Sequence, residues 1–166
     1  VLLVFTLFLA TFCARAATFV VTNSSDSGAG ALRQAILDAN AAAGLDTVTF
    51  QLGGSAPFTI SPVSALPSVT DPVVIDGTTQ PGYLSSPLVE LNGSSAGANA
   101  GLRLLAGNST VRGLVINRFG ADNIQVLDGT TYALVRQFSV GNGSNPYDIA
   151  FESGTHAYVT RYESPD

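Results

Sequence analysis

The stretch Ser109–Gly129, STVRGLVINRFGADNIQVLDG, decides how this chain is organised. Its first half, as far as Phe119, is a short apolar run interrupted by glycine, which is typical of strands that stack in register. In the second half, the apolar pattern of Leu102-Arg103-Leu104 returns at Ile124-Gln125-Val126, at a spacing that fits one further turn of the same stack. The stretch either continues one architecture or joins two.

The residues after Asn123 favour a junction. Arg136 stands where a stack in the same register needs a counterpart of Leu114, so the apolar positions do not repeat. Short β-runs follow instead, separated by the hairpin-sized turns DGTT, GNGSNP and ESGTH. An antiparallel meander of this kind is the layout of a β-propeller blade. We therefore predict a boundary within 120–123, with 17–120 forming one unit and 121–166 an incomplete second one.

Upstream of this stretch, the sequence predicts one helix and several short strands. The segment 31–42 carries apolar residues at helical spacing and is followed by Gly44. The segments 18–22 and 46–52 read as strands, and further β-runs are PFTIS, PVVIDG, PLVELNG and AGLRLLAGN. Strands this short must either stack in a solenoid or pair in a sandwich. A helix at the start favours the solenoid, because it can cap the open end of the stack.

Turn pairs separate the strands. Asp76-Gly77 and Asn92-Gly93 follow two of the β-runs, and residues that tolerate a positive φ suit sharp corners. We expect asparagines in the turns to form hydrogen-bonded stacks with a structural role. These are Asn92, Asn108, Asn117 and Asn123.

The N-terminus predicts export. The apolar run 1–14 precedes Ala14-Arg15-Ala16, the small-residue pattern of a signal peptidase site, so we predict a signal peptide over 1–16 with cleavage after Ala16. The run is shorter than the ~20 residues of a membrane-spanning helix, so no stable membrane span is expected after cleavage. The missing basic n-region and methionine predict that a few residues precede Val1. Cys13 is removed with this segment, which favours a bacterial surface or extracellular location over a disulfide-stabilised eukaryotic domain.

The charge pattern excludes one class of partner. The formal net charge is −5 and lysine is absent. Nucleic-acid binding requires clustered basic side chains. We therefore expect no nucleic-acid partner.

Two segments resemble known families. FVVTNSSDSGAGALRQAILDANAAAGLDTVTF, VVIDGTTQPG and NSTVRGLVINRFG resemble the N-terminal part of secreted bacterial right-handed parallel β-helix proteins, the pectin-lyase-like solenoids with a CSLREA-type start. GALRQAI takes the place of that signature, with Gly30 and Ala31 where the motif has Cys and Ser. This resemblance covers about 18–120. It implies a solenoid, export and a place in a large surface or extracellular protein.

The segment 123–166 resembles YVTN/WD-like propeller repeats, with AYVTRY matching the YVTN element and Arg161 in place of its Asn. The two resemblances together imply an all-β fold: a right-handed parallel β-helix start with one N-terminal capping helix, followed by an incomplete antiparallel β-propeller-like meander. The chain would be a fragment, since one blade cannot close a propeller.

The resemblance also implies which chemistry to look for. Polysaccharide lyases of the β-helix class hold Ca²⁺ with clustered carboxylates and use Arg or Lys as a base. The candidates here are Asp71, Asp76, Glu90 and Asp122, with Arg103, Arg112 and Arg118. No pair of these carboxylates is spaced to converge on one face, and Asp76 and Asp122 fit turn positions. We therefore assign no catalytic, cofactor-binding or metal residue, and Ca²⁺ enters only by family analogy.

The remaining polar and aromatic candidates fit structural roles. His156 lies in an expected hairpin turn without a second His or Cys. Aromatic residues of the C-terminal segment could form a sugar-stacking platform, but alternating aromatics are more typical of the core and rim of a sheet. They are Tyr132, Tyr147, Tyr158, Tyr162, Phe138 and Phe151.

These observations favour an exported, non-catalytic module that acts in adhesion, surface display or glycan contact, with polysaccharide or cell-surface components as partners. Two alternatives stay open. The chain could be the N-terminal part of a carbohydrate-active lyase or hydrolase whose catalytic residues lie elsewhere, or the start of a β-propeller binding module. The sequence does not establish an enzyme.

Overall fold

The structure is a computed structural model that describes residues 15–121, 124–127, 134–138, 145–153 and 156–162, with side chains up to 121 and at Ile124. Its elements are β1 (Thr18–Val21), α1 (Leu32–Ala41), β2 (Asp46–Phe50), β3 (Phe58–Ile60), β4 (Val73–Asp76), the 3₁₀ turn η1 (Gly77–Thr79), β5 (Val89–Asn92), β6 (Leu102–Leu104), β7 (Thr110–Arg112), β8 (Leu114–Asn117), β9 (Ile124–Leu127), β10 (Leu134–Phe138), β11 (Asn145–Ser153) and β12 (His156–Tyr162).

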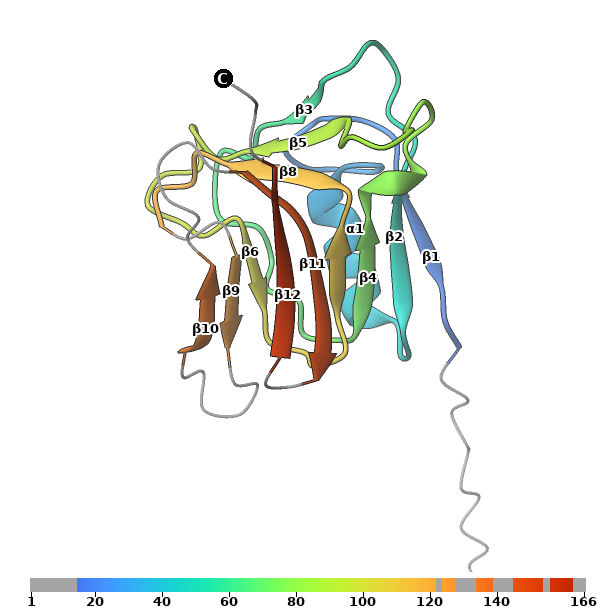
Figure 1. Cartoon of the computed structure of the whole chain (residues 1–166). Helices are drawn as coiled ribbons and strands as arrows, with labels where there is room; N and C mark the ends of the chain where they lie inside the picture. The colour runs from blue at the N-terminus through green and yellow to red at the C-terminus, as the bar shows by residue number, and fades with distance from the viewer. Residues whose placement is uncertain (1–14, 122–123, 128–133, 139–144, 154–155, 163–166) are drawn as a thin grey trace, which may run out of the picture.

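These strands form three sheets (Figure 1). Sheet A has the order β1-β2-β4-β7-β11-β12, sheet B has β3-β5-β8, and sheet C has β6-β9-β10. Neighbouring strands from β1 to β9 pair in parallel. From β4 onward the chain passes from sheet A to sheet B and then to sheet C, and it repeats this order from β7 to β9. Each new strand therefore lies beside a strand of the preceding passage.

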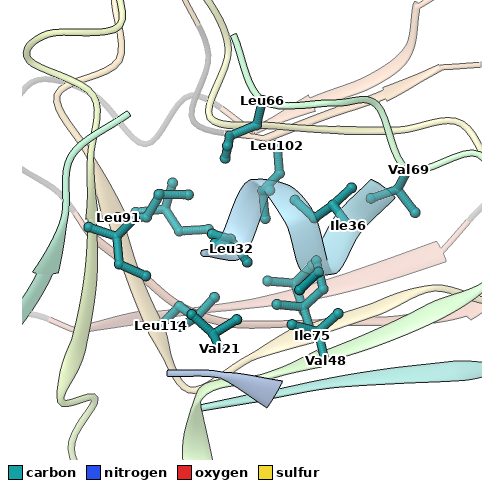
Figure 2. Packing of buried hydrophobic residues seen from close by; sticks show 14 of the residues in the cluster. Val21, Leu32, Ile36, Val48, Leu66, Val69, Ile75, Leu91, Leu102 and Leu114 are labelled. Carbon is teal, nitrogen blue, oxygen red and sulfur yellow. The ribbon is translucent and has the colours of Figure 1, made fainter. Parts of the chain in front are cut away.

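The helix forms where the sequence predicts it. It spans Leu32–Ala41 against the predicted 31–42, and the backbone N–H of Ala42 closes its last turn on the carbonyls of Asp38 and Ala39. The residues at helical spacing, Leu32, Ala35, Ile36 and Ala39, are the buried ones. In Figure 2, Leu32 and Ile36 lie among Val21, Val48, Ile75, Leu66 and Leu102, so the helix shares one core with strands and loops from all sides.

The fold class predicted from the sequence is wrong. An all-β chain was expected, with the helix as a cap over the open end of a β-helix. Instead, the apolar side of α1 packs on β1 and β2 and contributes Leu32 and Ile36 to the common core. Because β1, α1 and β2 form a parallel βαβ unit, the described chain is a small α/β domain with mixed sheets.

The antiparallel, propeller-like second part of the predicted fold class is also wrong. Ile124 of β9 pairs in parallel with Leu102 of β6, and Val126 pairs with Leu104, so β9 extends sheet C. The later strands do pair antiparallel, but β11 pairs with β7 and thereby adds itself and β12 to sheet A. Without these pairings, β6 and β7 would be edge strands with unpaired backbone N–H and C=O groups, and the later strands form hydrogen bonds with these groups. Strand pairing thus crosses 120–123, and the division into 17–120 and 121–166 stays a prediction.

The first half of the stretch Ser109–Gly129, as far as Phe119, holds two strands where one was expected. Gly113 has a φ of 67° and separates β7 in sheet A from β8 in sheet B. A Cβ atom at Gly113 would lie 2.6 Å from the backbone nitrogen of Thr78. Glycine is therefore needed both for the backbone conformation and for the close approach to η1.

Within the described part of the chain, no helix has the length and apolar character needed to cross a bilayer.

Candidate functional site

A groove of about 360 Å³ opens just beyond the carboxyl ends of β1 and β2. Ligand sites of α/β proteins favour this end of parallel strands. The volume falls in the lower part of the range of roughly 300–1,000 Å³ for small-molecule sites. The lining residues come from three segments: Thr22, Asn23 and Ser24; Leu52, Gly53 and Ser55; and Pro57, Phe58 and Thr59.

The first wall is the loop that leaves β1. The N–H groups of Thr22 and Asn23 both donate to the carbonyl of Gly30, at 2.9 and 3.2 Å, which folds the loop back on itself. The Asn23 amide donates to the carbonyl of Ala29 at 2.9 Å and accepts from the N–H of Ser25 at 3.1 Å. The loop thereby presents hydroxyl and amide groups on a backbone fixed by its own hydrogen bonds.

The second lining segment is the extension of β2. Side chains, in place of a neighbouring strand, form hydrogen bonds with its backbone. After β4 ends, Thr79 Oγ1 accepts from the N–H of Phe50 at 2.8 Å. Gln80, which is 2% exposed, accepts from the N–H of Leu52 at 2.8 Å and donates to its carbonyl at 2.9 Å. These bonds continue the ladder past the end of β4 and fix the backbone of Leu52, which lines the groove.

The third lining segment is the start of β3. The N–H of Phe58 donates to the carbonyl of Leu88 at 2.8 Å, and Phe58 is in register with Val89. Its ring is partly buried and packs against the core cluster, so its position is set by the fold. Thr59 is anchored through its hydroxyl, which donates to Glu90 at 2.9 Å.

The lining has a definite chemical character. It combines hydroxyls, one amide and one aromatic ring, and no lining residue among those that the structure describes carries a charge. Hydroxyl and amide groups both donate and accept hydrogen bonds, and an aromatic ring offers an apolar surface. The groove is therefore suited to a neutral, polar ligand with some apolar surface.

The carboxylates and arginines singled out in the sequence lie on different sheets. On sheet A, Asp76 is buried and pairs with Arg112 of β7, while the N–H and hydroxyl of Thr78 donate to it at 3.0 and 2.6 Å. Burial raises the pKa of Asp76, but the hydrogen bonds from Arg112 and Thr78 outweigh it and hold that pKa below its ordinary value. This pair ties β4 to β7 and lines no groove described here.

A second set lies on sheet B. Glu90 of β5 accepts from Thr59 on one side and from Asn117 and Arg118 on the other, at 2.9, 3.0 and 3.3 Å. The carboxylate thus bridges neighbouring parallel strands. Its oxygens are occupied by these structural partners, which gives no support to a role as a Ca²⁺ ligand.

Of the other candidates, Arg103 and Asp71 do not join either set. Arg103 is exposed on β6 of sheet C, and Asp71 precedes β4. Asp122 and Asn123 lie outside the described residues, as do the side chains of His156 and of the C-terminal aromatics. His156 begins β12, although a turn was predicted for it. The aromatic residues are Tyr132, Tyr147, Tyr158, Tyr162, Phe138 and Phe151.

The predicted asparagine stack is only partly present. Asn92 and Asn117 lie side by side in the register of β5 and β8. Each bonds elsewhere, however: Asn92 accepts from the N–H of Ser94 at 3.0 Å, and Asn117 donates to Glu90. Asn108 has a φ of 60°, which fits the predicted turn role.

Sequence reasoning missed the groove residues. One available signal was the polar triplet Thr22-Asn23-Ser24 directly after a strand, together with an aromatic residue at the start of the next β-run. Among the residues that the structure describes, no group of three or more His, Cys, Asp or Glu side chains could hold a metal ion. Comparisons with protein-family models, curated proteins and solved structures give no match.

Proposed function

We propose that this chain is part of an exported bacterial surface or extracellular protein and that its groove binds an uncharged glycan. The observation that carries the proposal is the lining of the groove: hydroxyl and amide groups around the ring of Phe58, without a charged side chain. Sugars present hydroxyls at their edges and C–H groups on their faces, so they need this combination.

The charge of the lining narrows the ligand class. An acidic polysaccharide needs cations to neutralise its carboxylates, and no lining residue supplies one. The chain as a whole has a net charge of −5, which repels polyanions further. We therefore propose neutral oligosaccharides as the ligands. The signal-like segment 1–16 supports contact with such ligands outside the cell.

The proposed role is binding without catalysis. The carboxylates of Asp76 and Glu90 are engaged by structural partners on two sheets, and neither lines the groove. A lyase or hydrolase activity would therefore have to reside elsewhere in a longer protein.

A binding assay with groove variants tests this function. Phe58→Leu keeps an apolar side chain against the core but removes the ring, and Ser55→Trp fills the groove from an exposed loop position. We expect each to weaken binding of a neutral oligosaccharide at least about tenfold, measured by calorimetry after a glycan-array screen. Thr70→Ala is the matched control, because Thr70 is exposed at the opposite, amino-terminal end of β4.

The outcomes separate the hypotheses. Equal binding by the folded wild type, Phe58→Leu and Ser55→Trp would show that the groove is not the site. A screen in which no neutral glycan binds would overturn the proposed function. Preferential binding of uronate oligosaccharides would favour the lyase-like alternative.

A further inference from the structure

The buried carboxylate of Asp46 lies against the backbone nitrogen of Ala17. The N–H of Ala17 donates to Asp46 Oδ1 at 2.7 Å. The Asp46 residue is 0% exposed, and its second oxygen, Oδ2, is buried without a hydrogen-bond partner among the described residues. A fully buried carboxylate held by one neutral N–H is costly, because the charge has lost its solvation without gaining a cation.

The surrounding strands fix this geometry. The N–H of Asp46 donates to the carbonyl of Pro72 at 3.1 Å, and the N–H of Thr47 donates to the carbonyl of Ala17 at 2.9 Å. Ala17 immediately precedes β1, whose first residue is in register with Thr47. The nitrogen of Ala17 and the carboxylate of Asp46 are therefore held together by the same ladder that forms sheet A.

Asp46 takes part in none of the ion pairs among the described residues. These pairs join Arg33 to Asp26, Arg112 to Asp76 and Arg118 to Glu90. The chain has no lysine that could supply another cation. The backbone nitrogen of Ala17 already touches Asp46, so a positive charge on this nitrogen would lie directly against the carboxylate.

We propose that proteolytic cleavage between Ala16 and Ala17 converts this nitrogen into an α-ammonium that forms a buried ion pair with Asp46. Hydrolysis consumes one water, leaves a carboxylate on Ala16 and leaves an amine on Ala17, which takes up a proton at neutral pH. The ammonium has more N–H donors than the amide it replaces, so it can satisfy both oxygens of Asp46. Asp46 is thus a receptor site for the processed terminus.

Accessibility agrees with this processing site. Arg15 and Ala16 are exposed, whereas Ala17 is partly buried against β2. A peptidase can reach Arg15 and Ala16, and the nitrogen that becomes the new terminus already contacts Asp46. The inference rests on the export proposed above, because the predicted signal peptidase site is the one that produces this terminus. It does not depend on the glycan.

The consequence is that the processed chain is more stable than its precursor. Hydrogen bonds to charged groups contribute about 1.5–3 kcal/mol, which corresponds to roughly a tenfold to hundredfold change in the folding equilibrium constant. That gain requires both a free ammonium at Ala17 and a carboxylate at position 46.

A double-mutant cycle tests the pair independently of export. One chain starts at Ala17, and an extended chain starts at Ala14 and carries Arg15→Gln, so that no guanidinium can substitute for the ammonium. Each is prepared with Asp46 and with Asp46→Asn, and urea unfolding gives the four folding constants. With Asp46, we expect the folding equilibrium constant of the chain that starts at Ala17 to be tenfold to hundredfold larger than that of the extended chain. With Asp46→Asn, we expect the two constants to differ by less than about twofold. An equal difference in both backgrounds, or none in either, overturns the proposal.

A second measurement needs no substitution. Because the chain lacks lysine, the terminal amine is its only primary amine. In the folded chain that starts at Ala17, an amine-reactive reagent at neutral pH should label it at least about tenfold more slowly than in urea. Labelling at the same rate in both states would show that the terminus is not held.

Terminal sequencing of the protein exported by a bacterial host tests the processing step separately. Ala17 as the first residue supports it, and any other first residue overturns it. A screen in which no neutral glycan binds would leave these results unaffected, so failure of the ligand proposal is distinguishable from failure of this one.

Discussion

The side-chain amide of Gln80 pairs with the backbone of Leu52 as a neighbouring strand would, accepting from its N–H at 2.8 Å and donating to its carbonyl at 2.9 Å. Gln80 is buried, so water cannot replace these bonds. Sheet A thus continues beyond β4 through a side chain, at the point where Leu52 lines the groove.

Gln80→Ala should lower the free energy of unfolding by about 2–5 kcal/mol, since it leaves a buried donor and a buried acceptor of Leu52 unsatisfied. Urea unfolding measures the loss. Gln51→Ala, at an exposed position on the same extension, is the control and should change stability by less than about 0.5 kcal/mol. Similar effects of the two substitutions would contradict the role assigned to Gln80.

Ile36→Asp should cost about 2–4 kcal/mol, because it places an unpaired charge where α1 meets the core. Ile36 is 1% exposed, whereas its neighbour Leu37 is 45% exposed. Leu37→Asp is therefore the matched control and should be close to neutral. If Ile36→Asp unfolds at the same urea concentration as wild type, α1 does not belong to the common core.

Gly93→Ala should destabilise the chain by about 1–3 kcal/mol through overpacking. A Cβ atom at Gly93 would lie 2.3 Å from the ring of Phe119, whereas Gly107 has no heavy atom within 4 Å of that position. Gly107→Ala is the control. Adding Phe119→Leu to Gly93→Ala should recover part of the loss, and the absence of any recovery would argue against the clash with the ring.

The Asp76–Arg112 pair should make stability fall in acid. The folded-state pKa of Asp76 is lowered, so its contribution is fully present above the unfolded pKa of about 3.9 and is lost as the pH falls through the folded pKa. Asp76→Asn should flatten the stability profile below about pH 4. Thermal unfolding from pH 2 to 7 measures this, and a wild-type profile that is no steeper than that of Asp76→Asn would contradict it.

Local patterns predicted the local elements well. The helical spacing of Leu32 and Ile36 located α1 to within one residue at each end, and the alternation of Val48 and Phe50 identified a strand whose alternate residues are buried. These patterns arise because one face of the helix or strand packs on the core, so they can be recognised from residues that are close together in the sequence. The short β-runs likewise appear as β3, β4, β5 and β6.

Non-local features were not predictable in this way. Asp76-Gly77 and Asn92-Gly93 suggested corners with positive φ, but neither glycine has one; each is needed because another segment comes too close for a Cβ atom. The pairings of β9 with β6 and of β11 with β7 join residues far apart in sequence. The groove has the same origin, because tertiary packing alone unites its three segments.

The strand order has a consequence for the way the chain assembles. In each sheet, every later strand of the sequence lies outside the earlier ones: β1, β2, β4, β7, β11 and β12 in sheet A, β3, β5 and β8 in sheet B, and β6, β9 and β10 in sheet C. No strand must be inserted between two that are already paired. A chain that is synthesised from its N-terminus can therefore add its strands in the order in which they appear, and each exposed sheet edge serves as the template for the next strand.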